Sequence, residues 1–519
     1  QTVLAFRDAS ILTLLCLSHG ANDARSRTGL SNYTFPKDFM FGVSTAAFQI
    51  EGGWNEGGKG ESMWDTYIHE HPDYTPDHSN GDIAADSYHK YMEDVAMVKS
   101  LKVKYYRMSI SWSRLLPLGT DNKISKDGAK YYRTLFEELI KANITPIVTL
   151  FHWDMPTPFM DLGGWANPKI GDYFEDYARV AFDLYGDIIK TWTTMNELHQ
   201  HCLNGYGGTF FVPVLNSHGI GEYLCNHYML LAHARVYHLY DKKYRPIQKG
   251  QIGITLDAFM AVPKDPTKKE DHEAAERYLQ MHMGLYAHPI FSETGDYPEL
   301  VRNLINNKSL EQGYTRSRLP YFTKEEVNLL RGSSDFFGLN HYTTYLFSPS
   351  EMEPDWKVPS IDHDAGVKME QNASWPVPGA EWLSVYPPGF RKLINWLTRN
   401  YGKKVPIIVT ENGVCDGGYL EDYERISYFN EYLDQLLLAI YEDGCNVQGY
   451  FAWTLMDDFE WSDGYLTKFG LFHVDFDSPE RTRTPKLSAL NYAEIVKTGR
   501  IDPDRFKPPS NIYHANRIR

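Results

Sequence analysis

Short apolar segments recur along the chain and alternate with longer amphipathic stretches. The short segments are rich in β-branched and aromatic residues, which predicts buried strands. In the stretches 127–143 and 423–443 apolar residues repeat at helical spacing, as Tyr131, Leu135, Leu139 and Ile140 do, which predicts helices between the strands. We predict eight strands, over Phe39–Ile50, Val103–Ile110, Thr145–Trp153, Thr191–Glu197, Gln251–Phe259, Phe336–Thr343, Pro406–Glu411 and Val447–Met456.

Alternating strands and helices are typical of β-α units around a parallel sheet, and eight such units close a barrel. The prediction is therefore an α/β fold, a single (β/α)8 TIM barrel with elaborated βα loops, over residues 31–500. Residues 1–30 are assigned to a leader or signal segment and residues 501–519 to a tail. The region 349–378, rich in Pro, Asp and Glu without apolar periodicity, is predicted to be a long loop after strand six.

Composition narrows the range of functions. The net charge of −15 would repel nucleic acid and anionic membranes, so neither is an expected partner. The chain is 14% aromatic, with 36 Tyr and 12 Trp. Aromatic rings of this kind suit a large core and also line sites for ligands with one polar edge and one apolar face.

The amino-terminal end and the sequons favour the secretory pathway. The apolar run 11–17 is similar to the end of a signal sequence and is too short to span a bilayer, although an upstream-translated leader is the alternative. Acceptor triplets for N-glycosylation begin at Asn32, Asn143, Asn307 and Asn372. We expect secretion, into a digestive or other extracellular space, or a lysosome-like lumen, and no transmembrane anchor.

Cysteine usage is low. Outside the leader stand only Cys202, Cys225, Cys415 and Cys445, which allow at most two disulfides of undetermined pairing. His199, His201 and Cys202 are metal-ligand types in one short segment. The sequence contains no CxxC pair, and a lone cluster beside a strand end more often supports a site than binds a metal, so we predict neither a metal nor a cofactor.

In a (β/α)8 barrel the chemistry lies at the carboxyl ends of the strands. Polar and aromatic residues gather at the predicted strand ends: Gln49, Arg107, His152, Trp153, Asn196, Glu197, Asn340, His341, Tyr342, Glu411, Trp453, Glu460 and Trp461. Amide, imidazole and carboxylate groups bind sugar hydroxyls, and indole rings stack on the apolar face of a pyranose. A carbohydrate is therefore the expected ligand.

Two carboxylates on different strands, Glu197 and Glu411, are the minimum equipment for glycoside hydrolysis. Burial close together would raise the pKa of one carboxyl and leave the other ionised. Arg107 and Tyr342 are donors suited to hold the nucleophile in its charged form. The alternative, in which each Glu is a salt-bridged structural residue, is weakened by the surrounding aromatic residues.

Several motifs resemble glycoside hydrolase family 1, the retaining β-glucosidases, including secreted animal and insect members. The resemblance runs from Phe35 to Glu494 and rests on Phe41–Gly52, Tyr106–Arg114, Thr193–Glu197, Ile408–Gly413 and Trp453–Trp461. It implies a retaining double displacement in which Glu411 attacks the anomeric carbon. Glu197 would protonate the aglycone oxygen and then deprotonate water.

The resemblance also assigns binding roles. It implies contacts to the glycone by Gln49, His152, Asn196, Glu460 and Trp461, with Trp453 as the stacking platform. Asn340 and Tyr342 match positions that support the nucleophile, together with Arg107. Trp382 matches the aromatic wall on the aglycone side, and Phe469 also falls among the substrate-binding positions.

Departures from the family pattern refine the expected substrate. Leu198 replaces the usual Pro after the acid/base, which removes a rigid φ, and Asp458 stands where Asn is frequent beside the glycone site. Glu460 is retained, and its charge would repel a phosphorylated glycone. Plant-type thioglucosidases have Gln in place of the acid/base, so Glu197 favours O-glycosides.

The expected function is hydrolysis of terminal non-reducing β-D-glucosides, with galactosides and fucosides left open. The alternatives are a thioglucosidase of the myrosinase kind and a catalytically silent carbohydrate-binding barrel. The expected partner is a small β-glucoside or oligosaccharide, and the sequence leaves a homodimer open.

Overall fold

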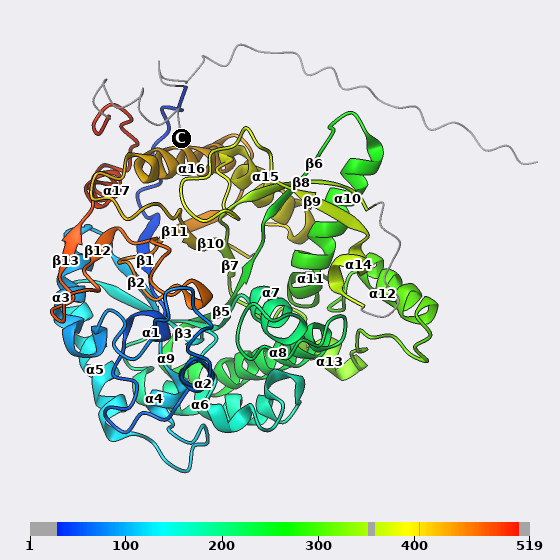
Figure 1. Ribbon diagram of the computed structural model, residues 1–519, viewed down its shortest axis with the longest axis horizontal. Helices are drawn as coiled ribbons and strands as arrows, with labels where there is room; N and C mark the ends of the chain where they lie inside the picture. The colour runs from blue at the N-terminus through cyan, green and yellow to red at the C-terminus, as the bar shows by residue number, and fades with distance from the viewer. Residues whose placement is uncertain (1–28, 351–358, 404, 508–519) are drawn as a thin grey trace, which may run out of the picture.

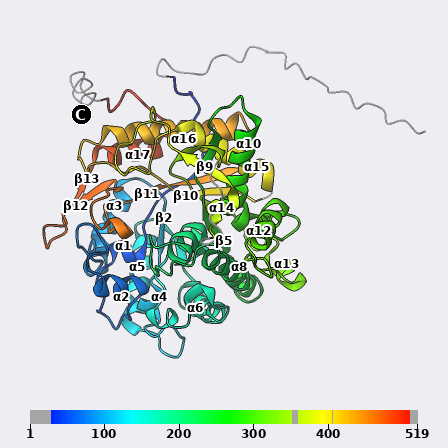
Figure 2. The same ribbon diagram turned by 45° about the vertical axis from the view of Figure 1, so that its right-hand side comes forward.

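The computed structural model describes residues 29–350, 359–403 and 405–507. The predicted leader and tail therefore lie mainly outside the described residues. The predicted (β/α)8 barrel is confirmed: eight parallel strands close into a barrel in the order β1-β11-β10-β7-β5-β4-β3-β2, with helices around them (Figures 1 and 2).

All eight predicted barrel strands are present. They are β1 (Met40–Ser44), β2 (Tyr105–Ser109), β3 (Thr145–Phe151), β4 (Thr191–Asn196), β5 (Gln251–Asp257), β7 (Phe337–Asn340), β10 (Ile407–Asn412) and β11 (Val447–Trp453). Several predicted ends were wrong, because the chain leaves the sheet earlier than the apolar pattern indicates. The first strand ends at Ser44, and Gln49 lies in a short helix instead.

Helices form the outer layer and short pieces of the loops. They are α1 (Ala47–Ile50), α2 (Met63–Glu70), α3 (Ser87–Ser100), α4 (Trp112–Leu115), α5 (Lys126–Lys141), α6 (Ile170–Tyr185), α7 (Leu198–His201), α8 (Gly221–Leu239), α9 (Arg245–Gln248), α10 (Lys269–Leu279), α11 (Leu285–Phe291), α12 (Glu299–Glu311), α13 (Lys324–Leu330), α14 (Ile361–Ala365), α15 (Pro387–Tyr401), α16 (Tyr423–Tyr441) and α17 (Leu487–Thr498).

The two helices predicted in detail are α5 and α16, each ending two residues before the predicted bound. Helix α5 begins after Ser125, whose Oγ accepts a hydrogen bond from the backbone N–H of Gly128 at 3.0 Å. Such an N-cap satisfies one of the free donors of the first turn. The buried face of α5 includes Tyr131 and Leu139, whereas Ile140 is exposed, so the predicted apolar stripe was one residue too wide.

A second sheet lies outside the barrel and corrects the predicted loop 349–378. β6 (Met260–Pro263), β8 (Thr344–Pro349) and β9 (Val367–Glu370) form this sheet, in which β9 pairs antiparallel with β8. The region thus contains a strand and helix α14. Its order comes from hydrogen bonds to a strand on another segment, which local apolar periodicity does not report. A further two-stranded sheet pairs β12 (Phe472–Val474) with β13 (Arg483–Pro485).

The barrel interior is filled near the amino ends of the strands. Ile147, Phe336, Ile408 and Phe451 form a separate apolar cluster there. Gly42 is required beside it, because a Cβ at this position would lie 2.3 Å from the ring of Phe451. This packing fills the barrel at the amino ends of the strands, so the space for a ligand lies at their carboxyl ends.

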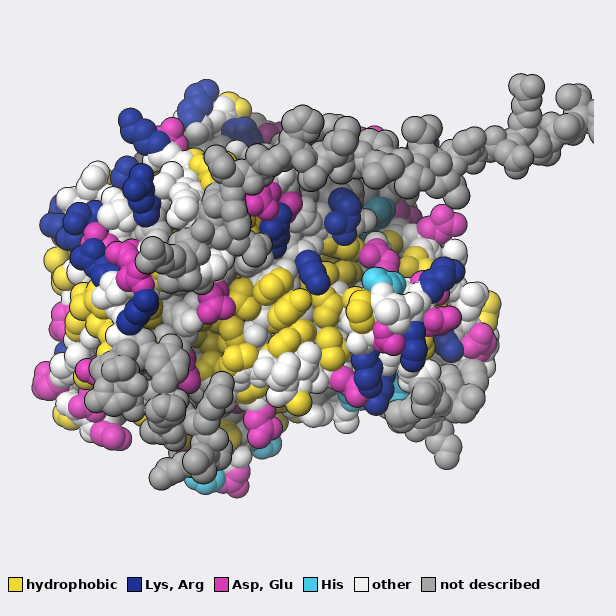
Figure 3. Space-filling model, turned by 90° about the horizontal axis from the view of Figure 1, so that it is seen from above, with side chains coloured by type: hydrophobic (Ala, Val, Ile, Leu, Met, Phe, Trp, Pro, Cys, Tyr) yellow, Lys and Arg dark blue, Asp and Glu magenta, His cyan; other side chains and the backbone are white. Residues whose placement is uncertain are grey.

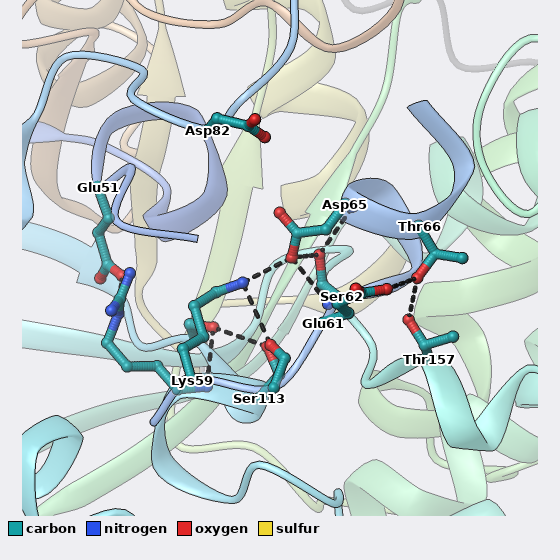
Figure 4. Close-up of polar contacts among 12 residues, drawn as sticks. Glu51, Lys59, Glu61, Ser62, Asp65, Thr66, Asp82, Ser113 and Thr157 are labelled. Atoms are coloured by element: carbon teal, nitrogen blue, oxygen red, sulfur yellow. Dashed lines mark hydrogen bonds and ion pairs between the residues drawn. The ribbon is translucent and has the colours of Figure 1, made fainter. Parts of the chain in front are cut away.

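The loop after β1 is braced by buried polar contacts, shown in Figure 4. Asp65 Oδ2 accepts hydrogen bonds from Lys59 Nζ at 2.6 Å and from the backbone N–H of Ser62 at 2.8 Å. Nearby, Arg114 Nε donates to Glu51 Oε2 at 2.7 Å. Glu51 directly follows helix α1, so this network fixes the segment that carries Gln49.

Among the described cysteines, Cys202 and Cys225 form a disulfide that joins the end of α7 to α8, and Cys415 and Cys445 are buried free thiols. Within the described ranges, the helices are all too short or too polar to cross a membrane. On the face shown in Figure 3, a band of hydrophobic side chains lies among scattered charged side chains.

Candidate active site

A cavity of about 340 Å³ opens at the carboxyl ends of the barrel strands. Both predicted catalytic carboxylates, Glu197 and Glu411, line it. The other lining residues include His152, Trp153, Gln200, Asn204, Phe210, Phe211, Asp257, Phe259, Asn340, Tyr342, Tyr345, Met369, Trp382, Trp453, Glu460, Trp461, Asp463 and Phe469. Most of the predicted strand-end residues are therefore brought together at one site.

Glu411 lies near the end of β10 and is held by two strong donors. Its Oε1 accepts a hydrogen bond from Arg107 Nη1 at 2.7 Å, and its Oε2 accepts one from the Tyr342 hydroxyl at 2.6 Å. Burial raises the pKa of Glu411, whereas the Arg107 charge and the bonds from Tyr342, Arg107 and Asn340 act in the opposite direction. The arrangement favours a localised negative charge on Glu411.

Glu197 follows β4 and has a different environment. Asn340 Nδ2 donates to its Oε1 at 2.7 Å, and among the described residues no Lys or Arg forms an ion pair with it. Burial raises the pKa of Glu197 well above its usual range, and the charges of Asp257 and Glu411 raise it further. Glu197 is thus suited to retain a proton while Glu411 stays ionised.

A hydrogen-bond network behind the cavity wall joins the two carboxyl groups. Arg107 Nη2 donates to Asn196 Oδ1 at 2.6 Å, and Asn340 Nδ2 contacts the same oxygen at 3.2 Å. Burial lowers the pKa of His152 well below its usual range, so the ring is neutral. Its Nε2 accepts from Asn196 Nδ2 at 3.1 Å, which leaves the proton on Nδ1.

At this end of the cavity, His152 Nδ1 and Gln49 Oε1 are buried and have no protein partner among the described residues. Buried polar atoms are normally hydrogen-bonded. Gln49 uses its other atom, Nε2, to contact Phe459 O at 3.1 Å, Glu460 Oε2 at 3.3 Å and Asp458 Oδ1 at 3.4 Å. One donor and one acceptor are therefore available to the hydroxyls of a bound sugar.

Asp458 and Glu460 form a second close carboxyl pair. Burial raises the pKa of each well above its usual range. The charge of Asp458 raises the pKa of Glu460 further, whereas the pKa of Asp458 is raised by the charge of Asp457 and lowered by a hydrogen bond with Glu460. Because two enclosed carboxylates repel each other, a shared proton is favoured. The departure at Asp458 thus changes the protonation of the glycone end.

Aromatic side chains form the walls. Trp453 ends β11, and Trp461 packs against Trp153 with ring centroids 4.8 Å apart. Across the cavity, Trp382 contacts Tyr342 and Phe469 at centroid distances of 6.0 and 6.5 Å. The first wall is buried, whereas Trp382 is partly exposed to solvent.

The backbone is left-handed at three residues of the cavity: Trp153 (φ 70°), Glu197 (φ 48°) and Trp461 (φ 50°). Such conformations are unfavourable for residues other than Gly and gather at functional sites. Gly413, after the nucleophile strand, meets a different constraint, since a Cβ there would lie 1.9 Å from the carbonyl oxygen of Trp453.

Leu198 begins helix α7 and is fully buried. The backbone of Glu197 is fixed on both sides, because its N–H donates to Thr255 O at 3.0 Å and its carbonyl accepts from the N–H of His201 at 3.1 Å. Packing and hydrogen bonds therefore hold this segment without the rigid φ of a proline.

The neighbouring ligand-type residues do not assemble a metal site. Cys202 is bonded to Cys225 and offers no thiolate, and within the described parts of the chain no three His, Cys, Asp or Glu side chains gather in a metal-binding arrangement.

Sequence reasoning missed part of the cavity. Asp257 ends β5, and examining the last polar residue of every strand would have found it. Gln200 lies on α7, Asn204 and Phe210 lie in the segment that follows α7, and Tyr345 and Met369 lie on the outer sheet. No strand-end rule applies to any of these positions.

The barrel and its two enclosed carboxyl groups, one bound to a cation and one not, define a protein of the glycoside hydrolase class. The sequence model described as Glycosyl hydrolase family 1 matches residues 31–500, and the chain belongs to this family. It is an O-glycosyl hydrolase of the β-glucosidase type.

The matches to two curated relatives extend over almost the whole length of those proteins. Myrosinase 1 of Brevicoryne brassicae is 45% identical over 470 residues, which is 90% of this chain and 100% of the relative. The cytosolic beta-glucosidase of Homo sapiens is 40% identical over 90% of this chain and 99% of its own. A third, the lactase/phlorizin hydrolase of Rattus norvegicus, is 45% identical, but the match covers only 24% of that longer protein.

Solved structures agree with the observed barrel. An aphid myrosinase superposes with a TM-score of 0.86 at 45% identity, over 90% of this chain and 100% of its own. A rice β-glucosidase mutant in a covalent complex with Glc has a TM-score of 0.83 at 34% identity, covering 88% of this chain and 98% of its own.

Proposed function

We propose that the protein hydrolyses terminal non-reducing β-D-glucosides with retention of configuration. Glu411 attacks the anomeric carbon, and the bond from this carbon to the aglycone oxygen breaks as Glu197 gives its proton to that oxygen. Glu197, now ionised, removes a proton from water, whose oxygen displaces Glu411 and restores both groups. The observation that carries this proposal is the asymmetry between Arg107-bound Glu411 and uncompensated Glu197.

The glycone end supports a neutral sugar as substrate. Among the described residues, His152 Nδ1 and Gln49 Oε1 have no hydrogen-bond partner and can bind sugar hydroxyls. The buried ring of Trp453 can stack on the apolar face of a pyranose. The Asp458 and Glu460 carboxyl groups would repel a phosphorylated glycone. Galactosides and fucosides share most of their hydroxyl groups with glucosides, so they should be tested as substrates together with glucosides.

O-glycosides are favoured over thioglucosides with an anionic aglycone. Glu197 supplies the proton that a poor oxygen leaving group needs. Of the described residues that line the cavity, none is Lys or Arg, whereas Glu197, Asp257, Glu411, Glu460 and Asp463 are acidic.

A secretory route is proposed on two observations. The Cys202–Cys225 disulfide is typical of oxidising compartments. Of the sequon asparagines, Asn32, Asn143 and Asn307 are exposed, and Asn372 is partly exposed. N-glycosylation would be detected as a mass shift removed by an amidase specific for N-glycans.

The decisive experiment is turnover of 4-nitrophenyl β-D-glucoside by wild type and by Glu411→Ala. The nucleophile variant should lose activity by roughly 10⁴-fold or more. The matched control is Glu270→Ala, which removes an exposed carboxylate from α10 and should match wild type. Undiminished turnover by Glu411→Ala would overturn the assignment.

Separate experiments test the retaining mechanism and the alternative that the protein is catalytically silent. A 2-deoxy-2-fluoroglucoside should leave a covalent adduct on Glu411, detectable by peptide mass spectrometry. NMR of the first product should show the β-anomer, and an α-anomer would rule out retention. A folded wild-type protein with neither adduct nor turnover would support the silent carbohydrate-binding barrel.

A further inference from the structure

Asp257 is a carboxylate of the cavity wall that the proposed reaction does not use. It ends β5, lines the cavity and is 5% exposed. Its cavity neighbours are Gln200 on α7 and Phe259, which follows two residues later. Asp257 therefore shares the cavity lining with a polar neighbour that it contacts and with an aromatic residue that is close in sequence.

Only one oxygen of Asp257 is occupied. Oδ2 accepts hydrogen bonds from Gln200 Nε2 at 2.9 Å and from His199 Nδ1 at 3.0 Å, whereas Oδ1 is buried and has no partner among the residues that the structure describes. A carboxylate only accepts, so His199 carries its proton on Nδ1. Its Nε2 lies 2.6 Å from Nδ1 of His282.

No strong cation compensates this carboxylate within the described part of the chain. Its one ion-pair partner there is His199, and neither Lys nor Arg contacts it. By contrast, Glu411 has Arg107. The charge of Asp257 reaches the reaction centre, since it is the largest charge effect that raises the pKa of Glu197.

Three aromatic side chains that contact one another line the same cavity as Asp257. Phe259 packs against Tyr345 at 5.4 Å and stacks on Trp382 at 6.0 Å between ring centroids. All three line the cavity. Aromatic faces carry partial negative charge and attract cations, so they reinforce the unpartnered carboxylate oxygen.

We propose that Asp257 Oδ1 and these rings bind an ammonium or other cationic group of the aglycone, so that the enzyme prefers glucosides with basic aglycones. This inference rests on the proposed function and narrows its substrate class. An aglycone cation would meet both an unsatisfied acceptor and aromatic faces, whereas an anionic aglycone would be repelled by the uncompensated carboxylate.

The test compares three phenyl β-D-glucosides of similar size, with 4-aminomethyl, 4-hydroxymethyl and 4-carboxy groups. For wild type, kcat/KM should be about tenfold higher for the cationic than for the neutral substrate and about tenfold lower for the anionic one. In Asp257→Asn the ratios should approach one. Because ratios within one variant are compared, a general loss of activity does not affect the result.

The matched control is Asp362→Asn, which removes an exposed carboxylate 3.8 Å from the far nitrogen of His282. Its substrate ratios should equal those of wild type. Equal kcat/KM values for all three glucosides in wild type, or ratios that Asp257→Asn leaves unchanged, would overturn the proposal.

A binding readout separates this inference from the proposed function. The three glucosides are titrated calorimetrically into Glu411→Gln, which binds without turnover. If wild type hydrolyses none of them but binding keeps the order cationic, neutral, anionic, then the proposed function fails and the charge preference stands. Binding without that order overturns the charge preference alone.

Discussion

The base and the mouth of the cavity differ in how firmly their side chains are held. At the base, Arg107, Asn196 and Asn340 are at most 1% exposed and lie within one hydrogen-bond network. At the mouth, Trp382 is 36% and Met369 49% exposed, and they lie on connections outside the barrel. The base is therefore suited to one transition state, whereas the mouth can accept aglycones of varied shape.

The largest effect is expected when the base loses its cation. Arg107→Leu removes the ion pair to Glu411 and raises the pKa of that carboxyl, so kcat for 4-nitrophenyl β-D-glucoside should fall roughly 10²- to 10³-fold. The control is Arg133→Leu, which breaks a partly exposed pair with Asp187 and should change kcat little. Equal kcat values for the two variants would contradict a rigid, charge-paired base.

The next effect concerns the support of the mouth. Replacing Cys202 and Cys225 together by Ala removes the disulfide between two residues that are 23 positions apart. Because the unfolded chain is then less restricted, the free energy of unfolding should fall by about 3 kcal/mol. Denaturant titration measures this change. The single variant Cys445→Ala, at a buried free thiol, serves as the control. If the double variant were no less stable than this control, the α7–α8 link would not support the mouth.

A smaller change at the base should appear in the pH profile. Tyr342→Phe removes a hydrogen bond that lowers the pKa of Glu411, so this pKa should rise. Glu411 must be ionised to attack, and the acidic limb of kcat/KM should therefore move to higher pH by about 1 unit. The alkaline limb, set by loss of the Glu197 proton, should move less. A shift of the acidic limb to lower pH would reject the assignment.

The smallest effect is expected at the mouth. Trp382→Ala should raise KM for 4-nitrophenyl β-D-glucoside about fivefold, since the partly exposed ring loses its contact with the aryl group. Methyl β-D-glucoside, which has almost no aglycone, should be hydrolysed with nearly unchanged kcat/KM. A similar loss for both substrates would show that Trp382 also organises the base.

Much of the base could be predicted from sequence because its residues stand at strand ends. The barrel strands are buried on both faces and read as apolar runs, so Glu197 and Glu411 could be located by position alone. Exact ends could not, because turns into the cavity depend on contacts with distant segments. Helix α1 illustrates this, since the N–H of Ala47 donates to Ser109 Oγ on β2.

The mouth was harder to predict for the same reason. Strand β9 acquires its order by pairing with β8, and the partners of Asp257 come from α7 and, through His199, from His282. The Cys202–Cys225 pair likewise depends on how α7 meets α8. None of these contacts leaves a periodic signal in its own segment.

The left-handed backbone at Trp153, Glu197 and Trp461 implies a conflict between catalytic activity and thermal stability. Each such residue stores roughly 1 kcal/mol or more that glycine would release, and Glu197 also keeps a carboxyl group out of water. A library of variants selected only for survival at high temperature should therefore accumulate glycine or asparagine at these positions. Such variants would gain thermal stability and lose catalytic turnover. A selection for a more stable enzyme must therefore measure activity in the same round.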